Sequence, residues 1–192
     1  AQKALSLSEF SIQQIQKTME SVVVKSFSKE EISGANSEIV GYFRCWNNDF
    51  TGGEIGRTFF PNHKEYQVAK VRFKVFNTYD TCIARIHIRE VNHGKIGNEL
   101  ITADIAQPIA KSLTKETTCE FDLSKYNITL SQQNIFVGIE IIKKGQTDNT
   151  SRSLSFVGSE TGNYYYKSSE TDPWDSFDEY TIYMKLLLKY DD

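Results

Sequence analysis

Strict alternation of apolar and polar residues constrains the fold of this chain more than any other feature of its sequence. Between Lys70 and Val75, three apolar residues alternate with three basic residues. Successive side chains of a β-strand point to opposite faces of the sheet, so this segment is predicted to be a strand with one buried and one solvated face. The same period of two recurs in Cys82–Arg89, Thr118–Leu123 and Tyr180–Lys189. This pattern is typical of antiparallel sheets that are covered on one face.

A more continuously apolar segment, Ile135–Ile142, is predicted to be a strand covered on both faces near the middle of the structure. Shorter strands are predicted at Val22–Phe27, Ile39–Cys45, Ile55–Phe60, Leu154–Val157 and Tyr164–Lys167. Asn, Gly and Pro residues separate these segments, and no long helical pattern interrupts them. About nine to ten strands at this spacing predict an all-β fold, an antiparallel jelly-roll or galactose-binding-like β-sandwich.

The first twenty residues have a different pattern. Ser6–Glu9 has the spacing of a capping box, and the apolar residues from Phe10 to Met19 fall roughly on one helical face. We expect a short N-terminal helix over residues 1–20 or, alternatively, an arm that packs the same apolar residues in another conformation. Residues 21–192 are expected to form one β-sandwich domain, because a chain of 192 residues is within the size range of a single domain.

The charge distribution argues against a nucleic-acid partner, and the hydropathy argues against a membrane span. The 22 basic and 25 acidic residues are scattered along the chain, so it lacks the basic stripe that binding to a phosphate backbone requires, and no nucleic acid is expected. No apolar run approaches the ~18 residues that span a bilayer, so no membrane span is expected. The chain opens with Ala1-Gln2-Lys3, which fits either a mature exported product or a trimmed chain. We expect export, with a secreted, periplasmic or cell-surface location.

Short phrases in the middle and C-terminal parts of the chain resemble a known family. In order, they are Gly53–Gly56, Lys70–Phe76, Tyr79–Cys82, Ile86–Ile88, Gly94–Lys95, Asn98–Ile101, Phe121–Ile128 and Tyr164–Tyr166 ahead of Trp174. Together they resemble the C-terminal β-sandwich segment of many exported Bacteroidetes proteins, often called carboxypeptidase-regulatory-like after a preceding domain. Asp122–Ile128 is the most specific phrase. The resemblance implies a surface or periplasmic sandwich, and this family has no agreed enzyme activity and no catalytic residues to transfer.

Catalytic and metal-binding motifs are not found. His63, His87 and His93 lie far apart, without the paired spacing that places two ligands on one face. No Ser lies in a Gly-x-Ser-x-Gly motif, and no Cys has the sequence context of a low-pKa nucleophile. Acidic residues cluster around Trp174, namely Asp172, Asp175, Asp178 and Glu179. Their spacing is not that of an EF-hand, so a solvated loop is favoured over a calcium site. We therefore expect no enzyme, no metal and no cofactor.

Each of the three cysteines has the strand parity of neighbouring apolar residues. Cys82 shares the parity of Ile86, Cys119 that of Phe121, and Cys45 lies two residues after Phe43. Free Cys is among the most buried residue types, so all three are predicted to be small core residues. A disulfide between Cys82 and Cys119 on paired strands is the alternative that export would permit.

Five aromatic residues are the candidate ligand-binding residues: Trp46, Tyr164, Tyr165, Tyr166 and Trp174. Sugar-binding modules stack flat aromatic rings against sugars, and three consecutive tyrosines in a strand must point to both faces. Packing is the favoured alternative for most of the five, because Trp and Tyr dominate the cores of small sandwiches. The leading hypothesis is a non-enzymatic cell-envelope module with a binding or structural role, whose partner is a glycan or another envelope protein. A carbohydrate-binding module that uses these rings is the alternative, and a glycan-active hydrolase is the least favoured.

Overall fold

A computed structural model describes residues 25–46, 52–131, 133–145, 147, 152–160, 162–178 and 180–191, with the backbone alone for residues 39–46. The helix or arm predicted for residues 1–20 lies outside this range. In the described part of the chain, the only helical element is a 3₁₀ turn, η1 (Ser124–Tyr126), and no helix is long and apolar enough to cross a membrane.

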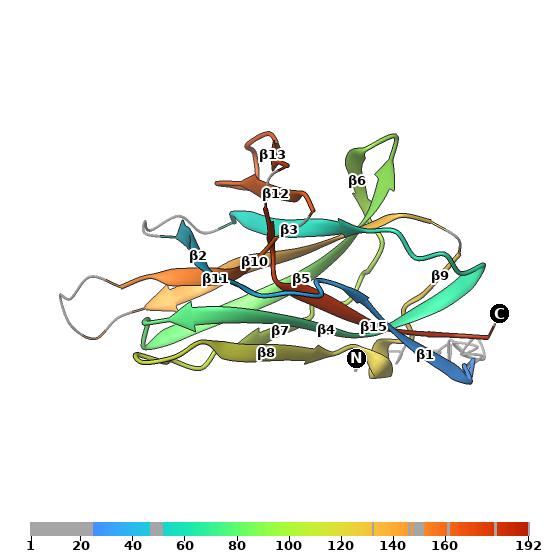
Figure 1. Cartoon of the computed structure of the whole chain (residues 1–192), viewed down its shortest axis with the longest axis horizontal. Helices are drawn as coiled ribbons and strands as arrows, with labels where there is room; N and C mark the ends of the chain where they lie inside the picture. Colours follow the sequence, from blue (N-terminus) through green and yellow to red (C-terminus); the bar gives the residue numbers. More distant parts are fainter. Residues whose placement is uncertain are drawn as a thin grey trace, which may run out of the picture.

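The described strands form two antiparallel sheets packed face to face (Figure 1). The first sheet contains β1 (Lys29–Gly34), β2 (Ile39–Trp46), β4 (Glu65–Asn77), β8 (Thr117–Asp122), β9 (Thr129–Ser131), β11 (Leu154–Ser159), β14 (Thr181–Ile182) and β15 (Met184–Tyr190). The second contains β3 (Glu54–Phe59), β5 (Thr81–Asn92), β6 (Lys95–Glu99), β7 (Ala106–Pro108), β10 (Ile135–Gly145), β12 (Tyr164–Lys167) and β13 (Asp175–Phe177). The predicted all-β jelly-roll sandwich is confirmed.

Strand β4 is the centre of the first sheet and has the predicted alternation. It pairs with β15 and β11 along one edge and with β8 and β9 along the other. Val71, Phe73 and Val75 are buried, whereas Lys70 and Arg72 on the opposite face pair with Glu120 of β8. The alternation therefore separates a core face from a charged outer face.

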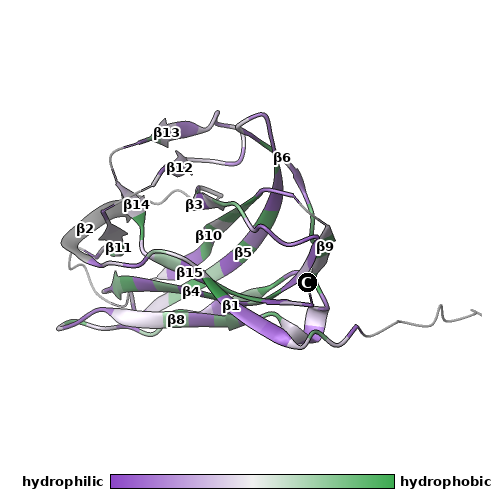
Figure 2. Ribbon diagram, turned by 45° about the vertical axis from the view of Figure 1, so that its right-hand side comes forward, coloured by the Kyte–Doolittle hydropathy of each residue, from purple (hydrophilic) through white to green (hydrophobic). Residues whose placement is uncertain are grey.

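Strand β10 lies between β3 and β5 in the second sheet, which confirms its predicted central position. Phe136, Val137 and Ile139 are fully buried, so both faces of this strand are covered. In Figure 2, hydrophilic and hydrophobic segments alternate along β5. Strands β12, β13 and β6 stand on the side of the second sheet that faces away from β4 and β8 (Figures 1 and 2). They flank the outer face of this sheet.

Cys82 and Cys119 are buried core residues, as predicted, and both are free thiols. Cys82 belongs to β5 in the second sheet and Cys119 to β8 in the first, so they do not lie on paired strands as the disulfide alternative required. Burial raises the pKa of both thiols to about 12. Cys45 lies in β2, where side chains are outside the described range.

Two sequence predictions about strands were wrong. Residues 25–27 of the predicted strand Val22–Phe27 are irregular, and β1 begins only at Lys29. The sequence of β1 is polar, and the strand forms because its backbone pairs with the edge of β15. The described residues contain fifteen strands rather than about ten. One cause is a break at Tyr183, whose N–H donates to the Val157 carbonyl and separates β14 from β15.

Candidate functional site

The candidate aromatics on β12 divide between the two faces of this strand. Tyr164 and Tyr166 pack against the hydrophobic core, and Tyr164 stacks on Phe177 with ring centroids 4.6 Å apart. Tyr165 points to the outer face, where its ring meets Phe136 edge-on at 6.0 Å. Trp174 meets the same ring at 4.9 Å. All four are half-buried, so they do not form one exposed coplanar patch.

Two glycines make room for the Phe136 ring on the outer face. Gly56 of β3 lies opposite Gly138 of β10, and Tyr165 pairs with Gly56 in the next strand. A Cβ atom at Gly56 would lie 2.4 Å from Phe136 Cζ, and one at Gly138 would lie 2.7 Å from Phe136 Cε1. Because real Cβ atoms do not approach this closely, the ring can lie over these strands only where side chains are absent. The side chain of Trp46, the fifth candidate, is outside the described range.

Beside these rings, a buried carboxylate connects three strands. Glu54 of β3 is 1% exposed, and its Oε2 lies 3.1 Å from Arg89 Nη2 of β5 and 3.5 Å from Lys167 Nζ of β12. Lys167 also lies over the ring of Trp174, 5.0 Å from its centroid. A buried carboxylate is stable only when cations or donors compensate its charge, and here two cations do so.

His87 of β5 bridges two further carboxylates on this face. Its Nδ1 lies 2.8 Å from Glu99 Oε2 and its Nε2 lies 3.0 Å from Glu140 Oε2. Burial by itself lowers the pKa of His87, but the hydrogen bonds to Glu140 and Glu99 and the neighbouring negative charges outweigh it and raise this pKa to about 9. The hydrogen bond from His87 lowers the pKa of Glu140 despite burial. Both groups therefore stay charged at neutral pH, which indicates a structural ion-pair network rather than an acid–base pair.

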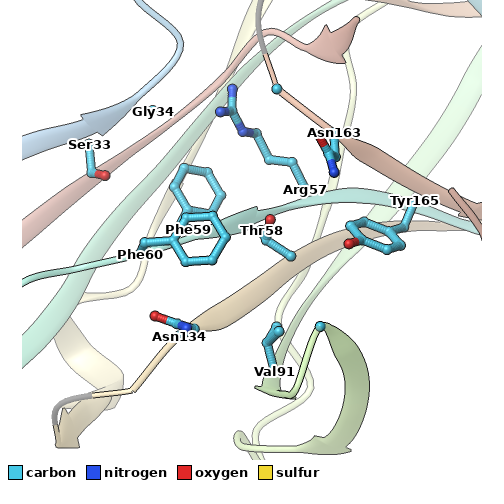
Figure 3. A pocket seen from close by; sticks show the side chains of 12 residues that line it. Ser33, Gly34, Arg57, Thr58, Phe59, Phe60, Val91, Asn134, Asn163 and Tyr165 are labelled. Atoms are coloured by element: carbon cyan, nitrogen blue, oxygen red, sulfur yellow. The ribbon is translucent and has the colours of Figure 1, made fainter. Parts of the chain in front are cut away.

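A cavity of about 600 Å³ lies beside β3, and residues from both faces of this strand line it. Its walls come from β1, β3, β12, the β5–β6 hairpin and Asn134 just before β10 (Figure 3). The cavity exists because β12 pairs with β3 only as far as Arg57, whereas β3 continues to Phe59. Its volume is that of pockets that hold small organic ligands.

Two aromatic residues give this cavity an apolar surface. Phe60, just after β3, is 66% exposed, the highest value among the exposed large apolar residues of the described chain. Tyr165 lines the cavity as well, whereas Tyr164, Tyr166 and Trp174 do not. Of the predicted site residues, the structure therefore places Tyr165 at the cavity, and it adds Phe60, which the sequence analysis did not predict.

Polar groups lie around the same cavity. The backbone carbonyl of Asn163 accepts a hydrogen bond from Thr181 Oγ1 at 3.1 Å, and that of Asn134 accepts one from the N–H of Val91 at 3.1 Å. The side-chain amides of Asn134 and Asn163 form no hydrogen bond with any described residue. Both residues are exposed, so two amide groups on fixed backbone are available to a ligand.

Arg57 of β3 also lines the cavity, and it has an unusual environment. It shares strand parity with the buried residues Ile55 and Phe59, and its guanidinium carbon lies 5.2 Å from the centre of the Phe59 ring. Its Nε and Nη1 atoms are buried and have no hydrogen-bond partner in the part of the chain that the structure describes. In Figure 3 the guanidinium extends away from Asn134 and Val91 into the space between Ser33 and Asn163.

Strand parity could have identified both residues that the sequence analysis missed. Phe59 and Phe60 are consecutive, so one of the two rings must leave the core, by the same rule that was applied to the three tyrosines. Arg57 is a cation at an inward position between two apolar residues, which is rare unless it has a partner or a function. The depth of the cavity, by contrast, depends on where β12 ends and has no local signal.

The described residues of the acidic cluster near Trp174 lie at the surface. Asp172, Asp175 and Asp178 are exposed, and Glu179 lies outside the described range. No group of three or more His, Cys, Asp or Glu side chains is arranged to hold a metal ion in the described part of the chain. The cavity beside β3 is therefore the best-defined candidate site.

No family model matches the chain, and no curated protein matches it. Solved structures with a similar fold include the cysteine protease and lectin-like domains of Cwp84, a surface layer associated protein of Clostridium difficile. The TM-score is 0.52 at 9% identity, over 72% of this chain and 32% of that chain. A second is the clostridial cysteine protease Cwp84 after propeptide cleavage, with a TM-score of 0.54 at 9% identity, over 84% of this chain and 40% of that one. The chain thus spans less than half of either structure, and the likeness concerns the fold alone.

Proposed function

We propose that this chain is a non-enzymatic binding module that acts at the cell envelope or outside the cell, and that its ligand is a glycan held in the cavity beside β3. The observation that carries the proposal is the exposed ring of Phe60 beside a cavity that Tyr165 and the exposed residues Asn134 and Asn163 also line. A sugar presents weakly positive C–H groups on its ring face and hydroxyl groups at its rim. The C–H groups can stack on an aromatic face, and the hydroxyl groups can form hydrogen bonds with side-chain amides.

The ionic network on the outer face supports a binding role over a hydrolytic one. Glycoside hydrolysis needs a carboxylic acid whose pKa is raised, so that it can protonate the leaving group. Here Glu54, Glu99 and Glu140 are each held by Arg, Lys or His side chains, and the pKa of Glu140 is lowered. These carboxylates are suited to stabilising the sheet beneath a ligand.

The location is supported by two observations of different kinds. The phrases from Gly53 to Trp174 resemble a segment of exported Bacteroidetes proteins. A structure with a similar fold comes from a surface layer associated protein that has a lectin-like domain. A glycan-binding module at the cell surface is consistent with both of these observations.

A glycan array followed by calorimetry of the best ligands tests the proposal. We expect Phe60→Ala to weaken binding about 10-fold or more, because it removes an exposed aromatic contact of the kind that dominates binding energies. Leu113→Ala is the matched control, since Leu113 is 59% exposed and does not line the cavity. It should bind like the unmodified chain. The proposal is wrong if no glycan binds, or if Phe60→Ala and Leu113→Ala bind equally well.

A further inference from the structure

We infer that the cavity beside β3 selects acidic glycans, and that Arg57 is the residue that receives their carboxylate or sulfate group. This inference rests on the proposed function and adds to it a ligand class and a specificity-determining residue. The two anionic groups share the relevant chemistry, a negative charge spread over oxygen atoms that accept hydrogen bonds.

Within the described residues, the guanidinium of Arg57 has no acidic partner and lies over the ring of Phe59. Nε and Nη1 are shut off from solvent and have no acceptor, and no described residue forms an ion pair with this side chain. The third nitrogen, Nη2, is not among these buried atoms. Burial lowers the pKa of Arg57, as expected for a cation that loses water without gaining a counter-charge. Native proteins pair nearly all buried polar groups, so this orphaned guanidinium needs a physical explanation, and an anion bound at the neighbouring Nη2 atom supplies one.

The rest of the cavity lining leaves this charge uncompensated. None of the described lining residues is an Asp or Glu, and Arg57 is the one cation among them. The positive charge is therefore directed into a cavity with an apolar wall at Phe59 and Phe60, where an electrostatic contact is stronger than in open water.

Unlike Arg57, the other arginines of the second sheet have acidic partners. Arg85 has Asp104 at 2.8 Å and Glu140 at 3.1 Å, and Arg89 has Glu54 at 3.1 Å. Each is neutralised by acidic residues of the protein itself. Among these three arginines, Arg57 alone has no acidic partner within the described residues, and its Nη2 atom is the donor that a carboxylate or sulfate group can reach.

The position of Arg57 suits a ligand that also touches the aromatic rings. Its guanidinium lies between Ser33 and Asn163, while Phe60 and Tyr165 line the same cavity (Figure 3). An acidic sugar placed there would direct its anionic group toward Arg57 and its ring toward an aromatic face. A neutral sugar would have the aromatic contact but would leave the guanidinium unpaired.

A binding assay with matched glycans tests this inference. Each acidic glycan is compared with its carboxyl-reduced or desulfated form, which retains the same linkages, and the two series separate carboxylate from sulfate recognition. We expect the acidic form to bind at least about 10-fold more tightly, since hydrogen bonds to charged groups are the strong ones. Arg57→Gln should abolish that preference, and Arg57→Lys should retain part of it. Arg72→Gln is the control, because Arg72 lies on the other sheet and pairs with Glu120.

Thermal unfolding shows whether the variants remain folded. Because two guanidinium nitrogens of Arg57 are buried with no hydrogen-bond partner among the described residues, we expect Arg57→Gln to unfold at the same temperature as the unmodified chain or higher. Neutral and acidic glycans that bind equally well, with no effect of Arg57→Gln, would overturn this inference and leave the proposed function intact. Absence of binding to every glycan would overturn both.

Discussion

At the scale of single residues, Gly138 shows how closely the outer face of the second sheet is packed. A Cβ atom there would lie 2.0 Å from Glu54 Oε1 and 2.7 Å from Phe136 Cε1. We expect Gly138→Ala to lower the free energy of unfolding by about 2–3 kcal/mol, because overpacking displaces both neighbours. Gly145→Ala in the same strand is the control, since its Cβ would meet only Thr81 at an ordinary 3.8 Å. Urea denaturation measures both, and equal midpoints would contradict the packing described for Phe136.

His87 makes stability depend on pH in a defined direction. Its pKa is raised from 6.5 to about 9 in the folded state, so the folded state binds the proton more tightly than the unfolded chain does. The stabilisation is complete below about pH 6.5 and is lost as pH rises through 9. We expect the free energy of unfolding to fall by on the order of 3 kcal/mol across that interval. The same interval should be nearly flat in His87→Gln, and a fall of the same size in that variant would exclude His87 as the cause.

The aromatic residues show which properties of single side chains the sequence alone could not predict. Alternation correctly predicted that the tyrosines of β12 divide between two faces: Tyr164 and Tyr166 pack against the core, whereas Tyr165 contacts Phe136 on the outer face. It did not single out Tyr165 as the one at a cavity, because that depends on the loop before β12 and on the hairpin between β5 and β6. Contacts between segments distant in sequence leave no local pattern.

At the scale of elements, Glu54 holds β3, β5 and β12 together through Arg89 and Lys167. Removing one partner of a buried charge pair leaves the others uncompensated, so we expect Glu54→Gln to destabilise the fold by about 3 kcal/mol. Glu120→Gln is the control, because Glu120 pairs with Lys70 and Arg72 at a solvated face, where ion pairs contribute under about 1 kcal/mol. Chemical denaturation compares the two variants, and a similar small loss in both would show that the outer-face network contributes little.

Sequence predicted the long strands well and the short ones poorly. The alternation in β4, β5 and β8 and the apolar run in β10 follow from burial, which selects residues of one kind on each face. Strands such as β1 and β6 are largely exposed and polar, and they form by pairing with a neighbour that is already fixed. Backbone pairing at a sheet edge requires no particular side chain, so composition cannot reveal it.

At the scale of the whole molecule, the second sheet has an outer face with ion pairs and aromatic rings, and a cavity lies at the end of β3 where β1 of the first sheet comes close. The first sheet has exposed ion pairs such as Arg72 with Glu120, whereas the second buries Glu54 under strands and loops that flank its outer face. The class of fold was predictable from the alternation of apolar and polar residues. The site was not, because it forms where β1, β3 and β12 meet the β5–β6 hairpin (Figure 3).

The central claim is that a glycan occupies the cavity beside β3, and nuclear magnetic resonance tests it most directly. The ¹⁵N-labelled chain is titrated with the best-binding glycan from an array, and the backbone amide shifts are mapped on the structure. We expect the largest changes at Thr58, Phe60, Asn163 and Tyr165, with little change along β4 and β8 on the other sheet. Changes centred on the first sheet, or confined to residues away from the cavity, would contradict the account.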